Sequence, residues 1–333
     1  VTYLSPYISR GVIAGKQVLE HLVQQGYTSE ELNVLVKELA WREYFQRCWW
    51  KYGDRIFDDM RKVSSESARG KVVKNMVQGS TGVHAIDREV NRLITEGYIH
   101  NHARMHIASL SCNIARVHWS RPAQWMYYHL LDGDLASNTL SWQWVAGTFS
   151  SKKYWFNQKN LNEFSRYEQH ETFLDHPYEE VSVMEVPSVL RDHTEMDLVT
   201  CLPDEKKPTL DYSLPLLLYN SYNLDPMWRK EMVANRILLL EPSHFRRHPV
   251  SKLVIDFILA LSSNIPRMQI FSGEIESIQS LERFPMIYSK AHPTSLHYPG
   301  VQDTPPWMFP AVRVEGSFSA FWKSCKTFLP SIE

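Results

Sequence analysis

The chain has 333 residues, of which 44% are hydrophobic and 22% are charged, and its formal net charge is −1 at pH 7. This composition is typical of a globular protein with a sizeable core, and the length predicts two domains. It argues against a disordered chain and against a membrane protein, because no apolar run is long enough to cross a bilayer.

Charge and cysteines set further bounds. Residues 1–167 carry 21 Lys and Arg against 15 Asp and Glu, whereas the remainder carries 15 against 22, so the first half permits contact with a polyanion without establishing it. The four cysteines are scattered without a CxxC pair, which argues against a disulfide framework or a cysteine-only metal site. We therefore expect no metal and, by default, a reducing cytoplasmic location.

The first half of the chain is predicted to be helical. Ser5 at an N-cap position, Pro6 at the first helical position and Gly26 at the stop predict one helix over residues 5–26. Apolar residues at helical spacing, with almost no alternating strand pattern, predict more helices in an all-α domain over residues 1–167. These helices are expected at about residues 30–52, 83–96, 100–117, 121–131 and 134–145.

The pattern changes in the second half. Residues 168–213 are acidic and punctuated by proline, which is typical of a linker packed over the surface. Short apolar runs then predict buried strands, and the helix between the last two indicates βαβ connections, a parallel sheet and a small α/β, Rossmann-like domain over residues 214–333. The strands are expected at residues 214–220, 236–242 and 267–273, with helices at 250–265 and 317–329.

Three of the predicted helices carry polar or aromatic groups where packing alone would place apolar residues. One interpretation is that the rings belong to the core and the charges pair with one another. Because isolated buried charges are costly, three such faces favour a buried polar ligand or network. A histidine metal site is disfavoured, since the histidines of residues 100–106 bring no adjacent ligand set. The faces comprise Glu38, Trp41, Arg42 and Phe45; Asn101, Arg104 and Met105; and Asp134, Asn138 and Trp142.

Four segments within residues 2–157 carry motifs that are jointly specific. They are TYLSPYISRGVI, ELAWREYF, GSTGVHAIDREVNRLITEGYIHNHARM and LLDGDLASNTLSWQW. Each resembles a motif of the flavin domain of the DNA photolyase/cryptochrome family, in the family's order and at nearly its spacing. The resemblance implies an α+β multidomain protein in which an all-α FAD-binding domain precedes the small α/β domain.

The resemblance also implies which residues bind FAD. Arg104 would pair with Asp132 beside the flavin ring, and Ser5 would help to hold the diphosphate. Asn138 would face flavin N5, where repair enzymes of the family carry asparagine, plant cryptochromes an acid and insect cryptochromes a cysteine. The cofactor-binding residues implied by the resemblance are Thr2, Leu4, Ser5, Arg42, Asn101, Arg104, Asp132, Asp134 and Asn138.

The implied activity is the light-driven repair of cyclobutane pyrimidine dimers in DNA by electron transfer from excited reduced FAD, a carbon–carbon lyase reaction. The (6-4) enzymes carry histidines where this chain has Asn101 and Met105, which favours the cyclobutane lesion. The alternatives are a cryptochrome-like photoreceptor and a flavin-binding protein without repair activity. The implied catalytic residues are Glu38, Asn138, Trp142 and Trp119, and the implied substrate-binding residues are Glu38, Trp41, Asn101, Met105 and Trp144.

The chain also departs from the family. His102 replaces an arginine of the family motif, Leu140 and Ser141 replace glycines, and residues 61–77 hold no tryptophan to follow Trp142 and Trp119 in an electron-transfer chain. The α/β antenna domain normally precedes the flavin domain, so its apparent pieces at the C-terminus predict a circular permutation, or else an unrelated appendage. We expect no second chromophore and no membrane contact; the oligomeric state stays open.

Overall fold

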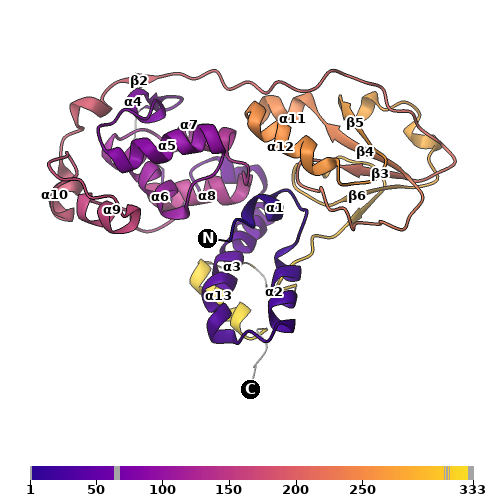
Figure 1. Cartoon of the computed structure of the whole chain (residues 1–333), viewed down its shortest axis with the longest axis horizontal. Coiled ribbons are helices and arrows are strands. Elements are labelled where there is room, and N and C mark those ends of the chain that lie inside the picture. The colour runs from indigo at the N-terminus through magenta and orange to yellow at the C-terminus, as the bar shows by residue number, and fades with distance from the viewer. Residues whose placement is uncertain (1, 64–67, 311, 313, 315, 329–333) are drawn as a thin grey trace. The chain divides into compact units, whose positions relative to one another are not determined.

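The computed structural model describes residues 2–63, 68–310, 312, 314 and 316–328 (Figure 1). Packing divides the chain into two units. Asp54–Leu198 forms the first unit, and Thr2–Gly53 together with the chain from Val199 onward forms the second. The two units meet at residues 53–54 and 198–199, whereas the sequence predicted domain boundaries at residues 167 and 213. Those domain boundaries stay a prediction.

Helices dominate the described part of the first unit (Figure 1). The helices predicted at residues 83–96, 121–131 and 134–145 are confirmed as α5, α7 and α8, and their apolar faces share one buried core. The helix predicted over residues 100–117 ends earlier, because a π-helical turn follows it. The elements are α4 (Lys74–Val77), α5 (His84–Glu96), α6 (Asn101–Ser109), the π-helical turn Leu110–Ile114, α7 (Ser120–His129), α8 (Leu135–Ala146), α9 (Gln158–Ser165) and α10 (Tyr178–Val183).

One strand pair corrects the all-α prediction for the first half. β1 (Val72–Val73) pairs antiparallel with β2 (His193–Thr194), and the backbone N–H of Lys74 donates to the carbonyl of Asp192 at 2.8 Å. Two residues are too few to show a strand pattern, and their partner lies over a hundred residues away. The segment predicted as a linker therefore contributes a strand to this unit, together with buried side chains at Leu174, Val181 and Leu190.

The prediction of a single helix over residues 5–26 is wrong. The second unit instead begins with α1 (Ser5–Ser9) and α2 (Gly15–Gln24). The N-cap residue of α1 is Leu4 rather than the predicted Ser5, and no side chain caps this helix of five residues.

Gly11 explains the interruption between α1 and α2. Its φ of +67° lies in the left-handed region, which other residues adopt only at a cost. A β-carbon on Gly11 would lie 2.2 Å from the carbonyl oxygen of Tyr222, over two hundred residues further along the chain. The backbone therefore approaches too closely for any other residue, and this long-range contact ends α1.

Replacing Gly11 with alanine is expected to lower the free energy of unfolding of the second unit by about 2–3 kcal/mol. The left-handed backbone accounts for about 1–2 kcal/mol, and the clash with Tyr222 adds to it. Gly26→Ala is the matched control, because Gly26 has a φ of +85° and nothing within 4 Å of an added β-carbon. Equal losses for the two variants in chemical denaturation would show that the contact with Tyr222 does not matter.

A five-stranded parallel sheet forms the rest of the second unit. Its order is β5-β4-β3-β6-β7, so the chain moves from β3 to one side and then returns to the other, as in doubly wound sheets. The three predicted strands are confirmed as β3, β4 and β5, whereas β6 and β7 were not predicted because they are short and only partly buried. The strands are β3 (Leu216–Tyr219), β4 (Asn235–Leu240), β5 (Met268–Ser272), β6 (Ile287–Lys290) and β7 (Val301–Asp303).

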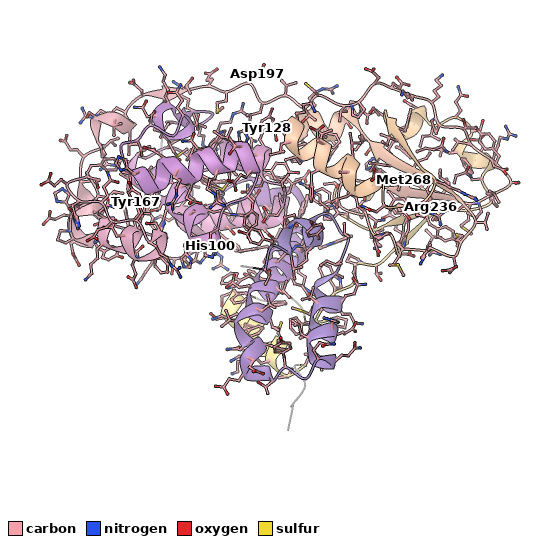
Figure 2. The ribbon with its side chains drawn as sticks, in the orientation of Figure 1. His100, Tyr128, Tyr167, Asp197, Arg236 and Met268 are labelled. Atoms are coloured by element: carbon pink, nitrogen blue, oxygen red, sulfur yellow. The ribbon has the colours of Figure 1, made fainter. Side chains whose placement is uncertain are left out.

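Helices accompany this sheet (Figure 1). α11 (Pro242–Arg247) follows β4, and α12 (Lys252–Ser262) confirms the predicted helix between β4 and β5. Arg236 and Met268, register partners on β4 and β5, lie side by side in Figure 2. The βαβ connection and the parallel pairing therefore follow the prediction.

The long helix α3 (Ser29–Tyr52) packs against the last helix, α13 (Phe318–Lys326). The Trp41 ring stacks on Phe318 with centroids 3.5 Å apart and an interplanar angle of 10°, and the Tyr44 hydroxyl donates to the Gly316 carbonyl at 2.9 Å. Both elements were predicted, although Leu329, the predicted end of the last helix, lies outside the described residues.

Candidate functional site

The predicted site residues fall in both units. Those of the second unit are Thr2, Leu4, Ser5, Glu38, Trp41 and Arg42, and those of the first are Asn101, Arg104, Met105, Trp119, Asp132, Asp134, Asn138, Trp142 and Trp144. Within the first unit, α6 and α8 contribute most of the latter group.

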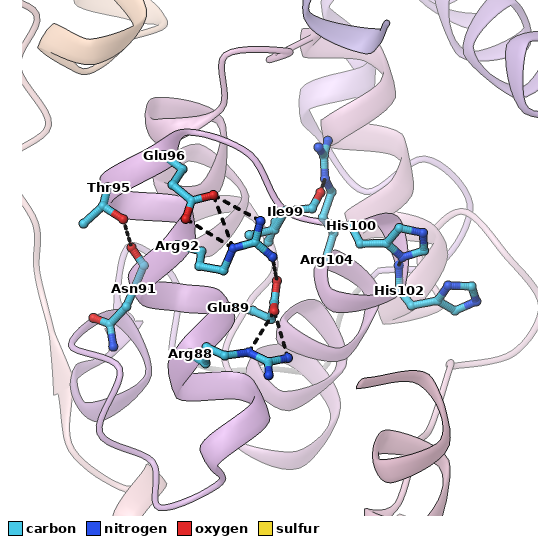
Figure 3. A network of polar contacts seen from close by, with 10 residues as sticks. All are labelled: Arg88, Glu89, Asn91, Arg92, Thr95, Glu96, Ile99, His100, His102 and Arg104. Carbon is cyan, nitrogen blue, oxygen red and sulfur yellow. Dashed lines mark hydrogen bonds and ion pairs between the residues drawn. The ribbon is translucent and has the colours of Figure 1, made fainter. Parts of the chain in front are cut away.

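A buried ion pair joins α6 to the turn before α8. Arg104 donates from Nη2 to Asp132 Oδ2 at 2.8 Å. Its Nε donates to the Ile99 carbonyl at 3.0 Å (Figure 3). The Asp132 side chain is only 5% exposed and that of Arg104 is 23% exposed. The predicted pairing of these two residues is therefore present in the structure.

Two more predicted cofactor residues lie at the start of α8. Asp134 is its N-cap residue, and its Oδ1 accepts from the Ser137 backbone N–H at 2.8 Å. Asn138 donates from Nδ2 to the Ala123 carbonyl on α7 at 2.9 Å. One N–H of the amide is committed in this way, and the Asn138 carbonyl oxygen accepts no hydrogen bond from the described residues.

Ser137 is a further candidate residue of this site, which the sequence did not indicate. Its hydroxyl oxygen is buried and has no hydrogen-bond partner among the described residues. Buried polar groups are normally satisfied, so a buried hydroxyl between Asp134 and Asn138 fits a site that receives a polar ligand. The donor set of this helix start, which combines amide, hydroxyl and carboxylate, suits the hydrogen-bonding edge of a flavin.

A stack of rings borders the start of α6. His102 stacks on His100 with ring centroids 5.3 Å apart and on Phe164 with centroids 4.1 Å apart. His100 is also the N-cap of α6, where its Nδ1 accepts from the His102 backbone N–H (Figure 3). Burial, followed by the neighbouring positive charges, lowers the pKa of His100. Phe164, on α9, was not predicted, because its pairing with His102 depends on tertiary packing.

The neighbouring positions on α6 are partly open. Asn101 is exposed and its amide lies 3.9 Å from the Met105 sulfur, so the two predicted substrate residues do lie together. His106, one turn after His102, is buried, which lowers its pKa to about 4 and keeps the ring neutral at physiological pH. It contacts Asn160 Oδ1 at 3.2 Å and is a core residue.

Three predicted tryptophans lie in or beside the core of the first unit. Trp119 and Trp142 are buried in the same core cluster, and the Trp119 indole donates to Asp59 Oδ1 at 2.6 Å. Trp144 is half-buried, with its ring centroid 6.1 Å from that of Tyr154. Asp59 was not singled out in the sequence, because nothing local marks a carboxylate as the partner of a distant indole.

In the second unit, the Thr2 hydroxyl accepts from the Leu4 backbone N–H at 3.5 Å, and Glu38 is exposed on α3. Arg42 lines a cavity of about 410 Å³ together with residues of α2 and of the segments that follow β3, β6 and β7. Since Phe318 covers one face of Trp41, a base that stacks on Trp41 must use the other face or displace Phe318.

Among the described residues, no group of three or more histidine, cysteine, aspartate or glutamate side chains is arranged to hold a metal ion. Across the same residues, no helix has the length and apolarity needed to span a membrane.

Residues 34–196 match the family model for the FAD binding domain of DNA photolyase. This part of the chain belongs to the photolyase/cryptochrome family of FAD-binding proteins, so the predicted family and cofactor are confirmed.

Similar proteins carry both family names. A deoxyribodipyrimidine photo-lyase of Streptomyces griseus is 32% identical over 44% of this chain and 32% of its own length. A cryptochrome DASH of Ostreococcus tauri is 29% identical over 47% of this chain and 30% of its own length. The crystal structure of a Synechocystis sp. PCC6803 cryptochrome covers 49% of this chain and 36% of that one, with 23% identity and a TM-score of 0.45. The chain spans about a third of the length of the curated relatives it matches.

Proposed function

We propose that this chain repairs cyclobutane pyrimidine dimers in DNA with light and bound FAD. The observation that carries the proposal is the polar cluster of the first unit, in which the buried Arg104–Asp132 pair accompanies uncommitted atoms of Ser137 and Asn138. When bound and reduced, FAD supplies the excited-state electron for the reaction. The family assignment of residues 34–196 supports this cofactor.

The residues of the first unit would hold and tune the cofactor. The Arg104–Asp132 pair would bind beside the flavin ring, and Asn138 would face flavin N5. The Asn138 carbonyl oxygen can accept a hydrogen bond from a protonated N5 without adding a charge, while one N–H of the same amide donates to Ala123 and fixes its orientation. Such a group favours a stable reduced flavin.

The ring stack at α6 supports contact with DNA. Extracting a dimer from the duplex costs a few kcal/mol, and stacking a base on an aromatic ring returns roughly 1–3 kcal/mol. Asn101 and Met105 lie beside His102, whose ring replaces the charge of the arginine expected from the family. We propose that Asn101 and Met105 contact the lesion, while the stack of His102 with His100 and Phe164 contacts the adjoining nucleotides.

A photoreceptor without repair activity is the second candidate. It is favoured by relatives named cryptochrome DASH at an identity similar to that of the photo-lyases, and by the loss of the arginine at residue 102. A repair assay separates the two. Blue light on holoprotein with fully reduced FAD and dimer-containing DNA should restore intact thymines, and a failure to do so would refute the repair function.

In that assay, Glu38→Ala is expected to reduce the repair rate about 10- to 100-fold. We propose that Glu38 stabilises the dimer radical anion, and loss of one preorganised group that stabilises a developing charge commonly costs this much or more. The flavin absorbance should stay unchanged. Glu20→Ala, an exposed glutamate on α2 of the same unit, should repair normally. An unchanged rate for Glu38→Ala would remove this residue from the mechanism.

A further inference from the structure

The hydrogen bond between Trp119 and Asp59 is a polar contact of the first unit that the proposed function does not use. The indole Nε1 lies 2.6 Å from Asp59 Oδ1, a distance typical of a strong, charge-assisted hydrogen bond. The Trp119 residue is 3% exposed and the Asp59 side chain is 6% exposed. A carboxylate and an indole therefore meet where water cannot screen their interaction.

Asp59 is held in place by α8, the helix that carries Trp142. Gln143, the residue after Trp142, donates from Nε2 to the Ile56 carbonyl at 2.7 Å and accepts from the Met60 backbone N–H at 3.0 Å. This buried amide brackets the turn that contains Asp59. The carboxylate is thus fixed relative to α8 by two hydrogen bonds that do not involve Trp119.

Other charged and titratable groups surround the Asp59 carboxylate. Arg69 Nη2 lies 3.2 Å from Oδ2 and is largely exposed, while the buried His118 Nε2 lies 3.4 Å from Oδ1. The Arg69 guanidinium links the buried carboxylate to the surface. Asp59 therefore has one oxygen for the indole and another for a charged group that reaches solvent.

No other tryptophan of the described first unit has such a partner. The indoles of Trp125, Trp142, Trp144 and Trp155 donate no hydrogen bond to a carboxylate in this part of the chain. A negative charge beside an indole stabilises the positive charge left by the loss of an electron, and it can also accept the Nε1 proton. This carboxylate favours oxidation of Trp119 over the other indoles of the described first unit.

We infer that Asp59 positions Trp119 and accepts its Nε1 proton, which makes Trp119 the terminal electron donor of the first unit. This inference rests on the proposed light-driven function. It explains how electron transfer can end at Trp119 although residues 61–77 provide no third tryptophan.

With photoexcited, oxidised FAD bound as the electron acceptor, one electron would leave the Trp119 indole by way of Trp142, and the Nε1 proton would move to Asp59 Oδ1. The two residues would then be a neutral Trp119 radical and a protonated Asp59 carboxyl, with the electron taken up by the acceptor. A thiolate in solution then returns one electron to Trp119 and becomes a thiyl radical, and the proton returns from Asp59 to Nε1.

The test is Asp59→Asn, which keeps the shape and the accepting oxygen but removes the charge and the proton acceptor. After a blue flash on full-length holoprotein with oxidised FAD, transient absorption should show a neutral tryptophan radical in the parent protein and a protonated radical cation in the variant. The yield of long-lived radical should fall at least about tenfold, because the loss of a buried charge–charge stabilisation shifts the balance by such factors. Asp58→Asn, at the exposed neighbouring aspartate, should behave as the parent.

Three further measurements test whether the role of Asp59 is merely structural. Asp59→Glu, which restores a carboxylate, should recover the neutral radical, and circular dichroism should show that each variant is folded. Oxidation of the flavin-free chain by a chemical one-electron oxidant should give the same pair of radical spectra, which tests Asp59 even if flavin photoreduction fails. Identical radical spectra and lifetimes for the parent and Asp59→Asn would overturn the inference. If the parent protein gives the expected radicals on chemical oxidation but none after the blue flash, the result would count against the proposed light-driven function and not against the role of Asp59.

Discussion

Replacing Arg104 with alanine is expected to lower the free energy of unfolding of the first unit by about 3–5 kcal/mol, the usual result when one partner of a buried ion pair is removed. The variant leaves the Asp132 carboxylate, 5% exposed, without its cation and leaves the Ile99 carbonyl without its donor. Since the pair is proposed to bind beside the flavin ring, FAD should also be lost on gel filtration. Denaturation curves and the flavin-to-protein absorbance ratio measure the two effects.

Arg92→Ala is the matched control for this prediction. Arg92, with 36% of its side chain accessible, pairs with Glu96 at 3.1 Å and with Glu89 at 3.4 Å, and Glu89 keeps a second cation in Arg88 when Arg92 is removed (Figure 3). Exposed pairs contribute about 0.2–1 kcal/mol, so this variant should retain FAD and nearly all of its stability. Asp132→Ala should cost less than Arg104→Ala, because the arginine left behind is more accessible to water. A loss for Arg104→Ala no larger than that for Arg92→Ala would contradict the role assigned to the pair.

The second prediction concerns Asn138→Asp, which is expected to destabilise the first unit by about 3 kcal/mol at neutral pH and to reduce repair sharply. The substitution removes the donor to the Ala123 carbonyl, and an unsatisfied buried acceptor costs about 1–3 kcal/mol. It also sets a carboxylate against that carbonyl oxygen. Beside a reduced flavin, the added negative charge would oppose the electron-rich state that repair requires.

The pH dependence of this variant has a defined sign. Repulsion from the Ala123 carbonyl raises the pKa of the new carboxyl in the folded state above its unfolded value of about 3.9. The folded state then binds more protons, so the penalty relative to the parent is present above the raised pKa and shrinks as the pH falls through it. Asn138→Ala, which lacks the charge, should show a penalty that does not change with pH. A pH-independent difference for Asn138→Asp would rule out this electrostatic explanation.

The sequence by itself determined the elements whose signals are local. Helical spacing located α3, α5, α7 and α8, and buried apolar runs located β3, β4 and β5. In the structure, Thr28 with Glu31 caps the start of α3, and Asp134 caps that of α8. The family, its cofactor and the Arg104–Asp132 pairing followed from motifs, because the chemistry of a flavin site requires particular side chains at fixed positions along the chain.

Tertiary structure alone decided the features that join residues distant in sequence. Gly11 ends α1 because the backbone of Tyr222 lies against it, and β1 forms because residues over a hundred positions away supply its partner. The same holds for Phe164 on His102 and Asp59 on Trp119. The local sequence around Phe164 or Asp59 does not indicate its role. That role depends on which distant side chain the tertiary packing brings into contact with it.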